Sequence, residues 1–255
     1  MKKDSQIKEE VRGKYAEIAE GNLKAIKTAE KSCGCGCNDV VDISLSYSNE
    51  DKASIPEGAD LGLGCGTPTA YANIKEGMTV LDLGSGAGID CFIAAKHVGA
   101  SGKVIGVDMT PEMIKKANEN KSKVNANNVE FRFGEIESLP VDSGTVDRVI
   151  SNCVINLVPD KKKAFAEIHR VLKADGKFTV SDIVTDGKIS EEERRNASLW
   201  AGCVSGALDK KDYLGIIEDA GFKDIKVTSE VKNNYELSSG AGLYSVTITG
   251  AKQGG

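Results

Sequence analysis

A short apolar run that ends in closely spaced glycines constrains this chain most. Residues 79–83 read Thr-Val-Leu-Asp-Leu, and Gly84, Gly86 and Gly88 follow at once. Glycines in a turn between a strand and a helix let the backbone approach a ligand closely. The N-terminus of the following helix adds free N–H groups and partial positive charge. The run therefore predicts a ligand-gripping loop after the first strand of an α/β domain.

The chain beyond this loop alternates between strand-like and helix-like segments. Apolar runs predict further strands at 103–107, 129–133, 147–151 and 177–183. Helix signals lie between them: an apolar helix at 88–98, Thr110 before Pro111, and Asp160 before an amphipathic run. Such alternation favours a mostly parallel sheet covered by helices on both faces. The predicted fold class is therefore α/β and Rossmann-like.

The C-terminal part of the chain breaks the alternation. Ser190 and Glu193 form a capping-box pattern for a helix through Trp200, and a second helix is expected at about 209–220. Two late strands, at 224–230 and 244–251, are separated by a loop instead of a helix. This hairpin-like end implies one antiparallel strand in a sheet of seven.

The N-terminal part differs again, because its first ~30 residues are helix-like and residues 38–75 are irregular. We therefore expect three regions. They are an N-terminal helical and cysteine-rich segment (1–60), a ligand-binding core (61–183), and a helical insertion (about 184–221) followed by the strands that complete the sheet (to 255).

Composition excludes several classes of function. The net charge is -5 and no basic patch stands out, so we expect no nucleic-acid partner. No apolar run approaches the ~20 residues of a membrane span, and the charged N-terminus lacks the apolar core of a signal peptide. We expect a cytoplasmic monomer that does not enter membranes. The seven cysteines then favour reactive or metal-binding thiols over a disulfide framework, although some, such as Cys91, are expected to be core residues.

The spacing of the glycines bears on which cofactor the loop takes. Asp108 ends the second expected strand, where an acidic residue can bind ribose hydroxyls. A dinucleotide fingerprint would place its third glycine at position 89, where Ile89 stands. Nicotinamide dinucleotide stays open as an alternative at this point.

The run Val-Leu-Asp-Leu-Gly-Ser-Gly-Ala-Gly at 80–88 resembles the first motif of S-adenosylmethionine-dependent methyltransferases. The resemblance implies a class I fold with an antiparallel seventh strand. It also implies a cofactor site, with Asp82 before the loop and four residues lining the methionine end: Gly84, Ser85, Gly86 and Gly88. Asn152, after the fourth strand, would face the methionine portion.

The same resemblance places the other end of the cofactor. Asp108 would hold the ribose hydroxyls, and Met109 would pack on the adenine ring. The family's adenine-edge position corresponds to Gly134, Glu135 and Ile136. Ordinary core packing is the alternative for Met109 and Ile136.

Three further cysteines bear on the substrate. Cys153 follows the fourth strand, and ligands of open α/β sheets bind at that rim. Cys65 and Cys203 each lie in a short glycine-containing segment. Three thiolates brought together would suit a soft, thiophilic centre, but the spacing along the chain does not show that they meet.

The segments around these cysteines closely resemble the three cysteine motifs of arsenite methyltransferases. They read Gly-Leu-Gly-Cys-Gly-Thr-Pro at 62–68, Ser-Asn-Cys-Val-Ile-Asn-Leu at 151–157 and Ala-Gly-Cys-Val-Ser-Gly-Ala at 201–207. The resemblance implies that Cys65, Cys153 and Cys203 hold trivalent arsenic for methylation in arsenic detoxification. Some family members carry a tyrosine where Leu63 stands, so a role tied to that hydroxyl has no counterpart here.

The N-terminal cysteines Cys33, Cys35 and Cys37 are redox candidates by the same resemblance. Cys65 would be released as methyl groups replace thiolates, and it would pair with one of them. Thioredoxin or a small thiol would then reduce the pair. Zinc sites usually space their cysteines more widely, so the alternatives for this cluster are soft-metal scavenging and a disordered segment with incidental thiols.

Two other functions stay open from the sequence. One is a methyltransferase for a small organic acceptor, with structural cysteines. The other is a non-catalytic soft-metal-binding protein, against which the intact glycine loop and Asp108 argue.

Overall fold

A seven-stranded sheet forms the core of the computed structural model, which describes residues 4–22, 47–195, 204, 206–234 and 237–254. The strand order is β3-β2-β1-β4-β5-β7-β6. The strands are β1 (Thr79–Leu83), β2 (Lys103–Asp108), β3 (Val129–Phe133), β4 (Val146–Asn152), β5 (Leu172–Asp186), β6 (Lys223–Asn233) and β7 (Gly242–Ala251). The first five run parallel, whereas β7 pairs antiparallel with both β5 and β6. The predicted mixed sheet with one antiparallel strand is confirmed.

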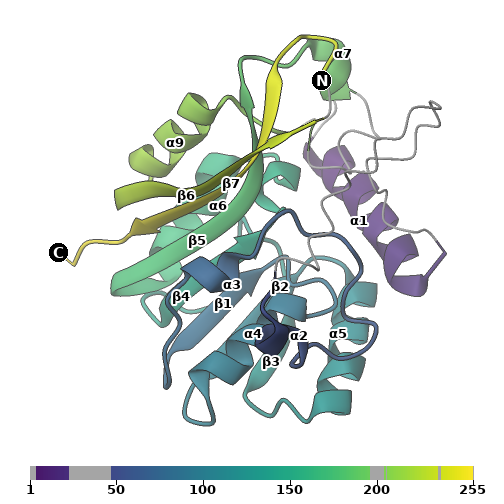
Figure 1. Cartoon of the computed structure of the whole chain (residues 1–255), viewed down its shortest axis with the longest axis vertical. Helices are drawn as coiled ribbons and strands as arrows, with labels where there is room; N and C mark the ends of the chain where they lie inside the picture. Colours follow the sequence, from purple (N-terminus) through teal and green to yellow (C-terminus); the bar gives the residue numbers. More distant parts are fainter. Residues whose placement is uncertain (1–3, 23–46, 196–203, 205, 235–236, 255) are drawn as a thin grey trace.

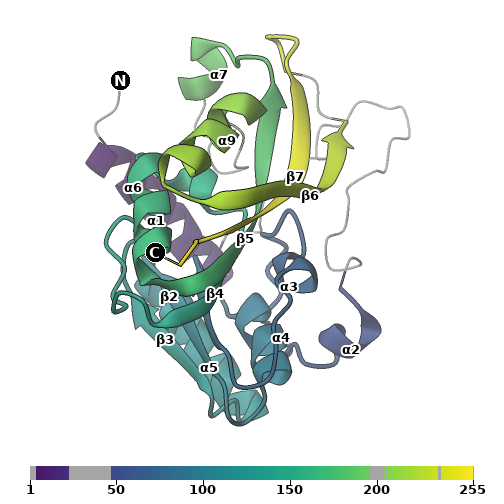
Figure 2. The same ribbon diagram turned by 90° about the vertical axis from the view of Figure 1, so that its left-hand side faces the viewer.

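Helices cover both faces of this sheet (Figures 1 and 2). The α-helices of the described residues are α1 (Asp4–Glu20), α2 (Asn49–Lys52), α3 (Pro68–Tyr71), α4 (Ile89–Val98), α5 (Pro111–Val124), α6 (Lys161–Val171), α7 (Glu191–Arg195) and α9 (Lys210–Asp219). Figure 2 shows α6 and α9 on one side of the sheet, with α3 and α4 on the other. Within the described residues no helix is long and apolar enough to cross a bilayer.

The alternation of side chains along β1 explains the two layers. Val80 packs in a cluster with residues of α4, whereas Leu81 and Leu83 belong to the cluster that contains Phe165 of α6 and Tyr213 of α9. All three β1 side chains are fully buried. A strand buried on both faces reads as a near-continuous apolar run, and residues 79–83 follow this pattern except at Asp82, which is buried as well.

The helix starts predicted from capping residues are largely confirmed. Asp160 accepts a hydrogen bond from the amide of Lys163 (3.0 Å), and Asp209 caps α9 in the same way. The capping box is present, because Ser190 N donates to Glu193 (2.8 Å) and Glu193 N donates to Ser190 Oγ (3.2 Å). Its helix is described only to Arg195, so the predicted extension through Trp200 lies outside the described residues.

Two local predictions were wrong. The fifth strand was expected at 177 but begins at Leu172, because a bulge between the pairs Val146–Leu172 and Arg148–Lys177 lets the pairing with β4 continue. The segment 38–75 was expected to be irregular, yet its described part contains α2 and α3. Pro68 at the first position of α3 is a helix start that the sequence contained.

Candidate active site

The glycine loop between β1 and α4 adopts a backbone that other residues rarely reach. Gly84, Gly86 and Gly88 have φ values of 63°, 51° and 97°. A Cβ at Gly84 would lie 2.5 Å from Cγ1 of Val154, so the space there is closed as well. The loop therefore depends on glycine for its conformation and, at Gly84, for the close approach of the segment after β4.

Ser85, inside this loop, carries an unsatisfied buried hydroxyl. Its amide donates to the carbonyl of Val107 (3.1 Å), but its Oγ has no hydrogen-bond partner among the described residues. Buried polar groups in proteins are nearly always hydrogen-bonded. An orphaned hydroxyl in a glycine loop is therefore the feature expected of a site that receives a polar ligand.

Asp108 joins the end of β2 to the same loop. Its Oδ2 accepts a hydrogen bond from Gly86 N (3.0 Å) and its Oδ1 accepts one from Thr110 N (2.8 Å). Burial raises the pKa of Asp108, while these backbone hydrogen bonds lower it. The structure thus places the predicted ribose-binding carboxylate directly beside the loop.

The four residues predicted at the adenine end of the cofactor differ from one another in burial and in partners. Gly134 N donates to the carbonyl of Asp108 (3.0 Å), which places it beside the acid. The exposed carboxylate of Glu135 pairs with Lys8 of α1 (2.7 Å). Ile136 belongs to the main core cluster, and Met109 packs against a second cluster that contains Cys153.

Two buried carboxylates flank the loop in the chain, one in β1 and one in α4. Asp82 of β1 accepts a hydrogen bond from Cys91 Sγ (3.2 Å), and burial raises its pKa well above the usual range. Asp90, in the first turn of α4, is also buried, and its pKa rises to about 6 mainly for the same reason. The structure places Cys91 in the core, as the sequence predicted.

The cysteines are the second part of the site. The structure brings Cys65 and Cys153 together in a disulfide, with 5.6 Å between their Cα atoms. Cys153 is 6% exposed and Cys65 is half-buried. Cys203 and the three N-terminal candidates, Cys33, Cys35 and Cys37, lie outside the described residues.

Asp182 of β5 completes this group and was missed by the sequence analysis. One of its carboxylate oxygens and the two sulfurs of Cys65 and Cys153 lie within 4.8 Å of one another. Asp182 is fully buried, and burial raises its pKa to about 7 although the charge of Lys161 opposes this. Its place near the carboxyl end of a parallel strand was the available signal.

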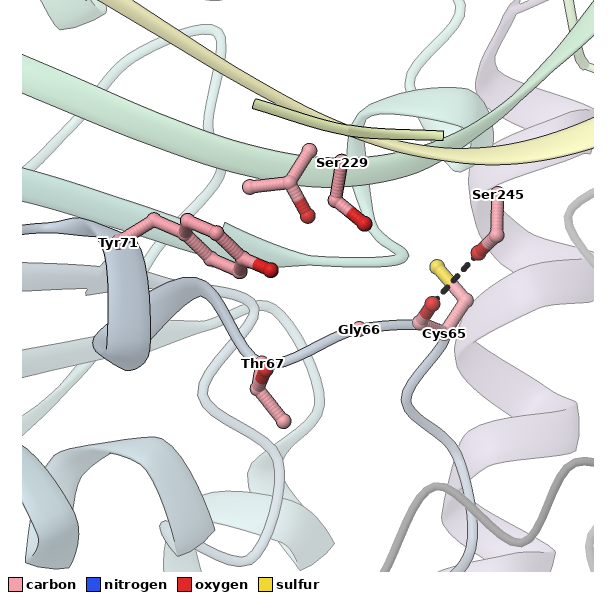
Figure 3. Close-up of a pocket in the computed structure, with 7 residues that line it drawn as sticks. Cys65, Gly66, Thr67, Tyr71, Ser229 and Ser245 are labelled. Atoms are coloured by element: carbon pink, nitrogen blue, oxygen red, sulfur yellow. Dashed lines mark hydrogen bonds between the residues drawn. The ribbon is translucent and has the colours of Figure 1, made fainter. Parts of the chain in front are cut away.

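A hydroxyl-lined cavity of about 220 Å³ opens beside Cys65 (Figure 3). Its walls come from the Cys65 segment, from α3 and from the strands β6 and β7. The lining residues are Cys65, Gly66, Thr67, Tyr71, Ser229, Ser245 and Thr247. Ser245 Oγ donates a hydrogen bond of 2.5 Å to the carbonyl of Cys65. The cavity gives the half-buried cysteine a polar approach from solvent.

Comparison with known proteins identifies this architecture. The sequence profile described as "Methyltransferase domain" matches residues 74–221, which hold the glycine loop, Asp108 and Cys153. The chain belongs to the methyltransferase domain family. The family and the loop residues decide the alternative left open by the glycine spacing: the cofactor is S-adenosylmethionine rather than a nicotinamide dinucleotide.

Individual relatives are more specific. The chain is 42% identical to an arsenite methyltransferase of Halobacterium salinarum, covering 96% of this chain and 66% of that protein. It is 32% identical to an arsenite methyltransferase of Rattus norvegicus, covering 86% and 60%. The chain therefore spans about two thirds or less of these curated relatives.

A solved structure agrees with these relatives. An arsenic (III) S-adenosylmethionine methyltransferase from Chlamydomonas reinhardtii matches with a TM-score of 0.70 and 33% identity, covering 84% of this chain and 73% of that one. The class I methyltransferase fold predicted from the sequence is confirmed.

Proposed function

We propose that this protein transfers methyl groups from S-adenosylmethionine to trivalent arsenic held by Cys65, Cys153 and Cys203. The observation that carries the proposal is the meeting of Cys65 and Cys153 beside the glycine loop. Val154, the residue after Cys153, fills the space in front of Gly84. The names of the relatives above support the same acceptor.

The choice of trivalent arsenic as the methyl acceptor follows from the cysteine ligands that would hold it. Trivalent arsenic is a soft centre, and thiolates are the ligands that soft centres prefer. Three thiolates leave the arsenic lone pair free to attack a methyl group. S-adenosylmethionine supplies that methyl group on a positively charged sulfur. Because the attacking lone pair carries no proton, the work of the protein is to hold both groups in line.

The disulfide sets a condition on this chemistry. Only thiolates bind arsenic, so the Cys65–Cys153 disulfide must be reduced before the substrate can enter. A small thiol or thioredoxin would supply the two electrons. Binding should also depend on pH, because the thiols must lose their protons.

The different exposure of the two cysteines suggests how the product is retained. Cys153 is buried, whereas Cys65 borders the open cavity. Methylation takes two electrons from arsenic, and Cys65 can return them by leaving in a disulfide with a second thiolate. Cys33, Cys35 and Cys37 are the candidates for that thiolate, and Cys153 and Cys203 would keep the trivalent product. Release of methylated arsenic would serve detoxification.

A methylation assay tests this function. The protein is incubated with arsenite, S-adenosylmethionine labelled in its methyl group and a thiol reductant, and labelled arsenic species are separated and counted. We expect labelled methylated arsenic. Arsenite binding without label would instead indicate a non-catalytic soft-metal-binding protein, and the absence of both would leave a methyltransferase for an organic acceptor.

A further inference from the structure

The side chain of Asn152, the last residue of β4, makes three hydrogen bonds to the backbone of Cys65 and Gly66. Its Oδ1 accepts from the amides of Cys65 (3.0 Å) and Gly66 (3.2 Å). Its Nδ2 donates to the carbonyl of Gly66 (2.8 Å). One amide side chain thus pairs with both the N–H groups and a carbonyl group of the segment that carries Cys65.

The same amide also reaches the helix that follows the glycine loop. Asn152 Nδ2 donates to Oδ2 of Asp90 (3.1 Å), and Tyr47 Oη donates to the other oxygen, Oδ1, of that carboxylate (3.0 Å). Asp90 is 2% exposed and Tyr47 is 6% exposed. Asp90 lies two residues after Gly88, so a chain of hydrogen bonds, buried at Asp90 and part-buried at Asn152, runs from the first turn of α4 to the backbone of Cys65.

The backbone on both sides of Cys65 is packed so closely against Asn152 and Ser181 that no side chain fits there. A Cβ at Gly64 would lie 2.9 Å from Asn152 Nδ2, and a Cβ at Gly66 would lie 2.6 Å from the side chain of Ser181. Glycine on both sides of the cysteine lets the backbone come close enough for the amide to grip it. The cysteine is therefore held through its main chain by contacts that do not involve its sulfur, which is joined to Cys153 here and is freed by reduction.

We propose that Asp90 and Asn152 form a clamp, completed by Tyr47, that fixes the position of Cys65 relative to the glycine loop. These are positioning residues, and the inference rests on the proposed function. It assigns to Asn152 a task beyond the contact with the methionine portion of the cofactor expected from the sequence. A clamp that ties the methyl-donor loop to an arsenic ligand keeps donor and acceptor in register, and small misplacements of reacting groups lower rates strongly.

The first test measures the reactivity of Cys65 in the absence of arsenic. The full chain is reduced and freed of reductant. Alkylation of Cys65 by iodoacetamide is then followed by peptide mass spectrometry. We expect Asn152→Ala to speed the alkylation by about tenfold, since several part-buried hydrogen bonds of ordinary strength are lost. Asn128→Ala is the matched control, because the Asn128 side chain also bonds to the backbone, donating to the carbonyls of Ala95 and Gly99, but lies away from Cys65. Equal alkylation rates in the two variants would overturn the clamp.

The second test exchanges the charges within the pair. Asn152→Asp alone places a second carboxylate against Asp90 and should loosen Cys65. Adding Asp90→Asn restores an amide facing a carboxylate, with an acceptor for the Cys65 amide and another for Tyr47, while the hydrogen bond to the Gly66 carbonyl stays lost. We expect alkylation of Cys65 to be slower in the double variant than in Asn152→Asp, together with a turnover number (kcat) for arsenite methylation several-fold above that of the single variant. A double variant no better than the single one would show that the two residues act independently, against the proposal.

The two proposals fail in different ways. If the wild-type protein methylates no arsenite, the proposed function falls, while the alkylation rates still decide the clamp. If methylation proceeds and Asn152→Ala leaves Cys65 reactivity at the level of the control, the clamp falls and the function stands.

Discussion

Cys65 and Cys153 are joined through their sulfurs although 88 residues separate them in the chain. The contact brings the glycine-flanked segment before β1 onto the carboxyl end of β4. The Cys153 amide donates to the carbonyl of Ser181 (2.7 Å), and its φ of 60° turns the chain sharply after the strand. The neighbouring strand β5 thus helps to hold the cysteine at the rim where the glycine loop also lies.

The cysteines should differ sharply in their importance for methylation. Replacing Cys153 or Cys203 with Ser removes a soft ligand, and we expect the arsenite methylation rate to fall by about a hundredfold or more. Cys91→Ser is the control, because Cys91 is buried in a core cluster on α4, and its sulfur donates a hydrogen bond to Asp82. Rates are compared after circular dichroism has shown that each variant is folded. Full activity in either of the first two variants would refute the three-thiolate site.

Two glycines with nearly the same backbone angle should respond differently to alanine. Gly84 has a φ of 63° and no room for a Cβ, whereas Gly144 has a φ of 66° and no atom within 4 Å of the place a Cβ would take. Gly84→Ala should lower S-adenosylmethionine affinity more than about tenfold, since the loop must move. Gly144→Ala should retain affinity and lose only about 1 to 2 kcal/mol of stability from left-handed strain. Calorimetric titration with S-adenosylmethionine and urea unfolding measure the two effects, and equal affinities would contradict the role of the loop.

Asp108 should be needed for cofactor binding because it holds the glycine loop, apart from the ribose contact that the sequence predicts. Asp108→Ala removes the acceptor for the amides of Gly86 and Thr110 and so frees the glycine loop. Hydrogen bonds to charged groups are worth about 1.5 to 3 kcal/mol, so we expect at least about a tenfold loss of S-adenosylmethionine affinity. Asp142→Ala, at an exposed position, serves as the control. Unchanged affinity in Asp108→Ala would exclude this acid from the cofactor site.

Asp182 should make the stability of the oxidised protein depend on pH. Its pKa is raised from 3.8 to about 7 in the fold, so the unfolded chain loses the proton first as the pH rises. The stabilisation present below about pH 4 is therefore lost as the pH rises through about 7. Relative to Asp182→Asn, the wild type should lose about 3 kcal/mol of unfolding free energy between pH 5 and pH 8. Lys161 and Tyr213 face the carboxylate, and the disulfide keeps Cys65 and Cys153 from titrating. Urea denaturation at both pH values measures the difference in unfolding free energy between the wild type and Asp182→Asn. A difference that is the same at pH 5 and pH 8 would contradict the raised pKa of Asp182.

The sequence predicted the features that depend on local pattern. The apolar run at 79–83, the glycines after it and the capping residues Asp160 and Ser190 each act over a few residues, and the structure has them as expected. The rim position of Cys153 followed from the general rule for parallel sheets. The same rule would have selected Asp182. It was not predicted, because no motif of catalytic or metal-binding residues surrounds it in the chain.

Other features depend on contacts between distant segments. The hydrogen bonds that the amides of Cys65 and Gly66 donate to Asn152 join positions more than eighty residues apart. The early start of β5 depends on a bulge in its pairing with β4. Neither is encoded in a local repeat or motif, so only the assembled fold reveals them.

A single-turnover experiment tests the central claim most directly. The reduced protein is loaded with one equivalent of arsenite, freed of unbound arsenic and mixed with methyl-labelled S-adenosylmethionine. We predict that the label appears on the protein-bound arsenic in the wild type and is absent in Cys203→Ser. Wild-type protein that binds both arsenite and S-adenosylmethionine but leaves the arsenic unlabelled would contradict the account.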